Sequence, residues 1–154
     1  MAKAEKASKT PVIANRKAYH EYTVVEELEA GIALLGCEVK MIRHGSFELR
    51  DAYCEVREGE VWLVNSHIPE YPQSSASEPY DPLRKRKLLL HAEEIRRLVR
   101  KVREKGFTVV PLRAFFLRGK VKLAIGLVRG KKQYDKRESI KERDIEREQR
   151  QKLR

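Results

Sequence analysis

Alternating apolar and polar residues in the first half of the chain predict β-strands. The alternation and the aromatic residues of 19–25 favour one strand, and residues 32–42 favour a longer one. In that longer strand the alternation separates an inward face from an outward face. The inward face would carry Leu35, Cys37, Val39 and Met41, and the outward face Glu38 and Lys40.

Turn-forming residues divide the middle of the chain. Glu58 and Gly59 lie between two strand-like segments, 52–57 and 61–65, which predicts a β-hairpin. Residues 68–83 contain four prolines and three serines, so we expect an exposed connection there.

Residues 92–105 show the clearest helical pattern of the chain. Four apolar residues recur at i, i+3, i+4 and i+7 and form one stripe: Ile95, Leu98, Val99 and Val102. Glu93 and Glu94 suit the positive end of the helix dipole, and Gly106 provides a stop. Two further strands are predicted over 107–117 and 121–128.

Six strands with one main helix inserted before the last pair predict a mainly β fold, a small antiparallel OB-like barrel over residues 13–129. Residues 1–12 lack periodicity and are expected to be a disordered arm. Residues 130–154 form a basic tail with few bulky aliphatic residues. Because such a segment has nothing to bury against the barrel, we expect it to stay disordered until a partner orders it.

The net charge of +11 is distributed unevenly over the 154 residues. Residues 1–17 carry +4, residues 18–83 carry −9, and residues 84–105 carry +7. The remaining segments, 106–128 and 129–154, carry +4 and +5. An acidic body with basic tails and one basic block favours a polyanionic partner that binds at particular surfaces.

Other classes of chemistry find little support in the sequence. Cys37 and Cys54 have no CxxC or histidine spacing and are expected to be core thiols in a reducing compartment. Neither a signal peptide nor an apolar run of membrane-spanning length is present, so a cytoplasmic protein is expected. Gly126 to Gly130 has the wrong spacing for a phosphate loop, and His20-Glu21 lacks a second histidine. We therefore expect no cofactor, no metal and no catalytic site.

The densest basic run is residues 84–87, which lie just before three leucines. It could be a solvated lead-in to the helix or a clamp for phosphate groups. The run by itself does not decide between these two interpretations.

Several ordered blocks resemble the SmpB family. They are residues 15–22, 29–32, 35–40 with 43–45, 86–91, 106–111 and 130–137, which together span roughly residues 12–150. The resemblance implies an OB-like barrel, a monomer that binds tmRNA, and a role in trans-translation on stalled ribosomes. Elongation factor Tu and alanyl-tRNA synthetase are further candidate partners through tmRNA, and no membrane is involved.

The resemblance also implies two groups of site residues. The RNA-facing group is Asn15, Arg16, Lys17, Glu29, Glu38, Lys40, Arg43, Lys85, Arg86, Lys87 and Leu88. The group expected at the ribosomal decoding centre is Gly130, Lys131, Lys132, Tyr134, Asp135, Lys136 and Arg137. By the same resemblance the tail becomes helical in the empty mRNA channel, and Tyr134 stands where some relatives have histidine.

Two other functions fit the sequence less well. A general OB-fold binder of single-stranded RNA would need exposed stacking aromatics, and only 7% of the residues are aromatic. An RNA-modifying enzyme would need a cofactor loop or a nucleophile, which the sequence does not display.

Overall fold

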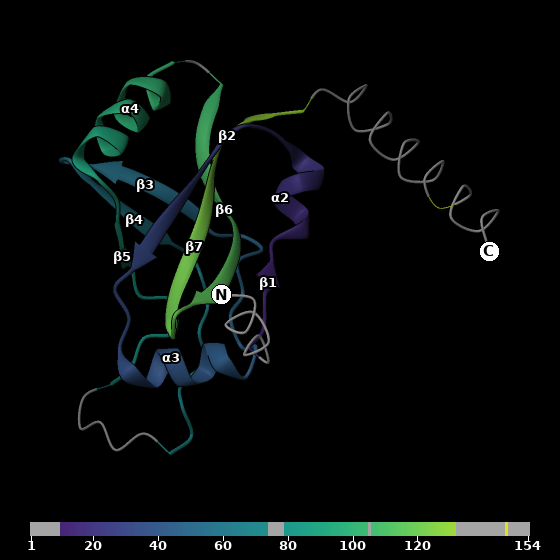
Figure 1. Cartoon of the computed structure of the whole chain (residues 1–154), viewed down its shortest axis with the longest axis vertical. Helices are drawn as coiled ribbons and strands as arrows, with labels where there is room; N and C mark the ends of the chain where they lie inside the picture. Colours follow the sequence, from purple (N-terminus) through teal and green to yellow (C-terminus); the bar gives the residue numbers. More distant parts are fainter. Residues whose placement is uncertain (1–9, 74–78, 105, 132–146, 148–154) are drawn as a thin grey trace.

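The computed structural model of the chain describes residues 10–73, 79–104, 106–131 and 147 (Figure 1). These residues contain one antiparallel sheet of seven strands. The strands are β1 (Ile13–Ala14), β2 (Tyr22–Ile32), β3 (Tyr53–Arg57), β4 (Glu60–Val64), β5 (Arg86–Leu89), β6 (Phe107–Leu117) and β7 (Lys120–Gly130).

The strand pairings close on themselves, because the last strand of the sheet order also pairs with the second one. Their order is β1-β6-β3-β4-β5-β2-β7, and β6 also pairs with β7. Six strands thus form a closed circuit of antiparallel pairs, with β1 added at β6. The predicted mainly β, antiparallel class is confirmed, and a closed circuit of pairings is what a small barrel requires.

The hairpins predicted from turn residues are present. β3 and β4 pair in register from Tyr53 with Val64 to Arg57 with Glu60, and the two turn residues between them have φ of 51° and 75°. Positive φ at both turn positions matches the right-handed twist of the strands. β6 and β7 pair in the same way along almost their whole length.

Three helices lie among the described residues: α2 (Arg16–Glu21), α3 (Gly36–Arg43) and α4 (Ala92–Val102). α4 is the predicted main helix, although it ends three residues before the expected boundary. Leu98 is its fully buried residue, whereas Val102 of the predicted stripe is exposed. α2 occupies the start of the predicted strand 19–25, so the strand β2 begins only at Tyr22.

The predicted strand over residues 32–42 is wrong, because β2 ends at Ile32 and α3 follows. The backbone N–H of Leu35 donates to Glu38 Oε1 at 2.8 Å, which closes the first turn of a helix. Glu38 and Ile42, four residues apart, are the buried residues of α3, and Leu35 is 48% exposed. Glu38, which was predicted to face outward, therefore has the most deeply buried side chain of α3.

The core fills the space enclosed by the sheet. Its fully buried members come from every long strand and from α4: Ala30, Val61, Leu63, Leu88, Leu98, Val109, Leu123 and Ile125. The described parts of the predicted connection 68–83 contain no helix and no named strand. In the part of the chain that the structure describes, no helix is long and apolar enough to cross a membrane.

Candidate nucleic-acid interface

The basic run that leads into β5 divides into two faces. Side chains alternate along an extended chain, so Arg86 points inward and is 0% exposed, while Lys85 and Lys87 point outward. The ammonium group of Lys85 lies 3.3 Å from Glu55 Oε2, and that of Lys87 lies 3.4 Å from Glu60 Oε1. Solvent-exposed ion pairs such as these two contribute only about 0–1 kcal/mol to the stability of the fold. Phosphate groups can therefore compete with the glutamates for both lysines.

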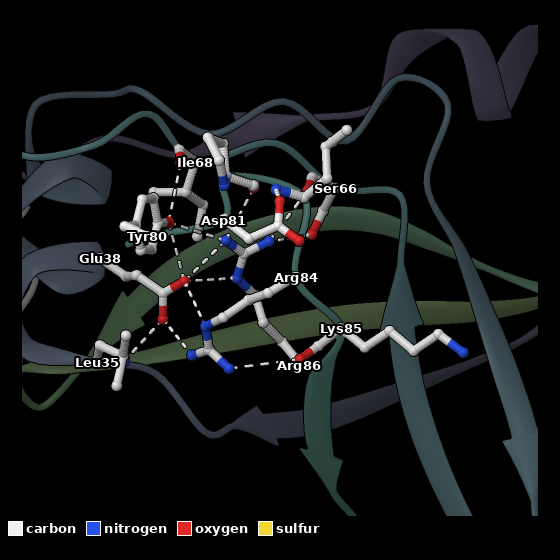
Figure 2. A network of polar contacts seen from close by, with 11 residues as sticks. Leu35, Glu38, Ser66, Ile68, Tyr80, Asp81, Arg84, Lys85 and Arg86 are labelled. Carbon is white, nitrogen blue, oxygen red and sulfur yellow. Dashed lines mark hydrogen bonds and ion pairs between the residues drawn. The ribbon is translucent and has the colours of Figure 1, made fainter. Parts of the chain in front are cut away.

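Glu38 of α3 lies beneath this run and binds two arginines (Figure 2). Its Oε2 accepts hydrogen bonds from Arg86 Nε at 2.8 Å and from Arg84 Nε at 3.1 Å. Its Oε1 accepts from the Leu35 N–H and from Arg84. The Tyr80 hydroxyl is 3.1 Å from Oε2. The expected outward position of Glu38 is wrong, since its side chain is wholly buried and leaves no surface for an RNA.

The guanidinium of Arg86 uses its donors within the protein. Nη1 donates to the backbone oxygen and the hydroxyl of Ser66, both at 3.0 Å. Nη2 donates to the Tyr80 hydroxyl and to the Pro82 carbonyl, both at 3.0 Å. Arg86 is thus a structural cation that ties β5 to the ends of the proline-rich connection. It is not placed to bind phosphate, which corrects the expectation for this residue.

The charge states in this network follow from its contacts. Burial would raise the pKa of Glu38, but the hydrogen bonds from Arg84, Leu35 and Arg86 outweigh it and hold that pKa below its ordinary value. Burial, together with the negative charge of Glu38, raises the pKa of Tyr80 to about 12. At neutral pH the network therefore combines an ionised carboxylate, two cations and a neutral phenol.

The buried network fixes the position of α3, whose exposed side carries the next candidates. Lys40 and Arg43 are exposed and lie three residues apart, on the same side of the helix. The Lys40 ammonium is 5.1 Å from the centre of the Tyr71 ring, and the Arg43 guanidinium is 5.9 Å from the centre of the Phe116 ring. Both cations are accessible, and the aromatic contacts limit how far their side chains move.

Asn15 is buried and holds the amino-terminal segment in place. Its side-chain amide donates to the backbone oxygens of Leu49 at 3.0 Å and Pro111 at 2.8 Å. Its Oδ1 accepts from the Ala18 N–H at 3.3 Å and caps α2. The Asn15 side chain therefore supports the segment that carries the next two candidates and has no free surface of its own.

Arg16 and Lys17 are exposed on α2. Lys17 Nζ lies 2.9 Å from Asp51 Oδ1, and this hydrogen bond raises the pKa of Lys17 and lowers that of Asp51. Arg16 has no ion pair with any residue that the structure describes. Glu29 is exposed on β2, where it pairs in register with Ala124 of β7.

The remaining candidates fall at the ends of strands or outside the described residues. Leu88 is 1% exposed and belongs to the core. Gly130 pairs with Tyr22 at the end of β7, and the Lys131 N–H donates to the Glu21 carbonyl at 3.0 Å. Five of the tail residues expected at the decoding centre lie outside the described residues: Lys132, Tyr134, Asp135, Lys136 and Arg137.

Sequence reasoning missed the neutral members of the network, Tyr80 and Ser66. Both belong to or border the proline-rich connection, and their only sequence signal is weak. Tyr80 is an aromatic residue in a segment that otherwise looks fully exposed. Its position beside Arg86 arises from contacts across the fold that no local pattern encodes.

The described part of the chain gives little support for a metal site or a reactive thiol. No group of three histidine, cysteine, aspartate or glutamate side chains there could hold a metal ion. Cys54 is buried, and burial raises the pKa of its thiol, which disfavours the reactive thiolate. Cys37 is half-buried on α3, whereas the sequence predicted that it would lie in a strand.

Comparison with known proteins gives one consistent result. The chain matches the SmpB protein family over residues 12–154. It is 52% identical to the SsrA-binding protein of Symbiobacterium thermophilum over 149 residues, covering 96% of this chain and 93% of that protein. It is 49% identical to the SsrA-binding protein of Sulfurihydrogenibium sp. over 141 residues, 92% of each chain. A solved structure described as "tmRNA-SmpB: a journey to the center of the bacterial ribosome" is similar with a TM-score of 0.66 and 44% identity, covering 85% of this chain and 95% of that one.

Proposed function

Because the chain belongs to the SmpB family, we propose that it binds the tRNA-like part of tmRNA and delivers it to stalled ribosomes for trans-translation. The observation that carries this proposal is the near-complete match to SsrA-binding proteins at about half identity. The solved relative, which joins SmpB, tmRNA and the ribosome in its description, supports the same partners.

The exposed cations around the buried network are suited to hold an RNA backbone. Lys40 and Arg43 project from α3, and Lys85 and Lys87 project from the segment that Glu38 ties to α3. Lysine and arginine side chains displace condensed counterions when they meet phosphates. We assign the direct contacts to these exposed residues together with Arg16, Lys17 and Glu29. We assign supporting roles to the buried Asn15, Glu38, Arg86 and Leu88.

The segment 130–154 is proposed to test whether the mRNA channel is empty. A channel that already holds mRNA excludes the segment sterically, because the mRNA occupies the space and covers the rRNA phosphates that the segment would contact. An empty channel offers rRNA phosphates to Lys131, Lys132, Lys136 and Arg137, and a decoding-centre surface to Gly130, Tyr134 and Asp135. Ordering backbone costs about 1–2 kcal/mol per residue, so occupancy requires many contacts at once.

In this proposal the protein binds tmRNA and the ribosome and is not an enzyme. It works as a monomer in the cytoplasm, with residues 13–129 as the RNA-binding unit between an amino-terminal arm and the basic tail. Elongation factor Tu and alanyl-tRNA synthetase act on the complex through tmRNA.

A binding competition tests the proposal. The full-length protein should bind tmRNA in the presence of a large excess of bulk tRNA, and unstructured RNA should compete poorly. Equal competition by unstructured RNA would instead favour a general single-strand binder. Deleting residues 130–154 should leave tmRNA affinity within a few-fold and abolish tagging on stalled ribosomes. A large loss of tmRNA affinity would contradict the division of roles between body and tail.

A further inference from the structure

We propose that the outer face of α4 is a second RNA-binding surface, on which Arg96, Arg100 and Arg103 contact phosphates of ribosomal RNA. The inference rests on the proposed function, because it takes the ribosome as the place where the protein acts. It concerns residues that lie outside the surface around α3 and β5.

The three arginines lie four and three residues apart, which places them on one side of a helix. At a rise of 1.5 Å per residue they extend over about 10 Å of the helix axis. All three are exposed, and none of their side chains forms a hydrogen bond or ion pair with a residue that the structure describes. Their neighbour Arg97 differs, because it is bound to Glu26 of β2. The ridge is therefore a row of free guanidinium groups.

Helix stability does not account for this ridge. Like charges three or four residues apart destabilise a helix, and Arg96, Arg100 and Arg103 form two such pairs. Favourable interaction with the helix dipole explains a cation in the last turn but not Arg96, which lies in the first half of α4. The contact of α4 with the core is made by Leu98 and Ile95 and needs no arginine. The row is not needed for the contact of α4 with the core, and it is complementary to a line of phosphates.

The surface beside the ridge is hollowed. A groove of about 810 Å³ runs between α4 and the β3–β4 turn at Gly59. Arg96 and Arg100 line it together with the side chains of Ile95 and Val99. The acidic lining residues, Glu93 and Glu94, belong to the first turn of the helix. A phosphate backbone is therefore expected to follow the carboxy-terminal part of the helix, away from these two carboxylates.

The position of α4 in the fold identifies the RNA. Figure 1 shows α4 and α3 at opposite ends of the molecule, so an RNA held at α3 leaves the α4 ridge open. The chain continues from α4 into β6, and Phe107 at the start of β6 pairs with Arg129 at the end of β7. The ridge thus lies at the end of the molecule from which residues 130–154 depart. When that segment enters the small ribosomal subunit, the ridge faces ribosomal RNA.

The test uses the full-length variant R96Q/R100Q/R103Q and a control with the same change of charge, R50Q/R118Q/K120Q. The control positions are exposed and form no ion pair within the described residues. We expect the α4 variant to bind tmRNA within twofold of wild type. Its tmRNA complex should bind ribosomes with an empty mRNA channel at least tenfold more weakly, with a salt slope lower by about two to three. The control should keep the wild-type ribosome affinity and slope.

Further measurements separate the possible failures. R96K/R100K/R103K keeps the charge and should keep most of the salt slope. A photo-crosslinking residue at position 100 should attach to ribosomal RNA. Wild-type ribosome affinity in the glutamine variant, or a crosslink to a ribosomal protein, would overturn the proposal. A loss of tmRNA affinity would place the ridge on tmRNA and also overturn it. If the proposed function itself fails, wild type will bind neither tmRNA nor these ribosomes.

Discussion

Replacing Glu38 by glutamine should lower the free energy of unfolding by about 3–5 kcal/mol, the cost of removing one partner from a buried ion pair. The side chains of Glu38 and Arg86 are both 0% exposed, and that of Arg84 is 30% exposed. Glutamine has nearly the same shape but no charge. It also turns one acceptor into a donor that faces an arginine. Arg86 would then be a buried cation without a counter-ion, although its hydrogen bonds to Ser66 and Pro82 remain.

Urea unfolding of the full-length protein, followed by circular dichroism, measures this loss. With a slope of about 1–3 kcal/mol per molar urea, the midpoint should fall by roughly 2 M. E55Q is the matched control, because Glu55 also pairs with a basic residue of the same run, Lys85 at 3.3 Å, but near the surface. E55Q should cost less than about 1 kcal/mol. If E38Q and E55Q destabilise equally, the assignment of Glu38 as a buried structural anion is refuted.

The same network sets a pH dependence. The pKa of Glu38 is lower in the folded protein than its ordinary value of 4.5. The ionised carboxylate therefore contributes stability fully above about pH 4.5, and this contribution is lost as the pH falls through the lower, folded pKa. E38Q has no such carboxylate to protonate. Its stability should consequently decline less steeply than that of wild type below pH 4.5, and an unchanged slope would contradict this linkage.

Three further changes test other parts of the structure. K85Q/K87Q should lower the salt slope of tmRNA binding by about two without changing the urea midpoint, and an unchanged slope would remove both lysines from the interface. N15A should cost about 2–3 kcal/mol in urea unfolding, because it removes a helix cap and the two buried hydrogen bonds that the side-chain amide donates to the carbonyls of Leu49 and Pro111. G126A should cost about 1–3 kcal/mol, since a Cβ would lie 2.8 Å from Leu112 Cδ1 inside the core. A midpoint unaffected by G126A would show that Leu112 moves freely.

The carboxy-terminal strands could be predicted because their signal is local. Residues 107–117 and 121–128 are apolar runs that contain β-branched residues and are joined by a turn containing Gly119, so the observed β6 and β7 differ from them by two residues or fewer. α4 could be predicted for the same reason, since its apolar spacing and its stop at Gly106 lie within one segment. The resemblance to the SmpB family, read from ordered blocks, is confirmed by the family match.

α3 could not be predicted because its decisive contacts are remote in sequence. Residues 32–42 alternate well enough for a strand, and a short apolar run does not separate the two structures. The helix is favoured by burying Glu38, whose partners Arg84 and Arg86 come 46 and 48 residues later. A glutamate on an otherwise apolar segment is normally assigned to the solvent face, and that rule placed Glu38 on the wrong side.

The division of the basic run illustrates the same limit at the candidate site. Strand alternation predicts that the cations of residues 84–87 fall in two pairs on opposite faces of the strand. It does not predict that one of these charged faces points into the protein. Arg86 can be buried only because an acid is buried with it, and the acid belongs to α3. One contact therefore has two consequences. It fixes α3, with Lys40 and Arg43, against the strand, and it forces Lys85 and Lys87 outward by parity. An apolar pair in place of Glu38 and Arg86 could stabilise the fold equally well. It would lack the directed hydrogen bonds that set the rotation of α3 and, with it, the placement of the exposed cations.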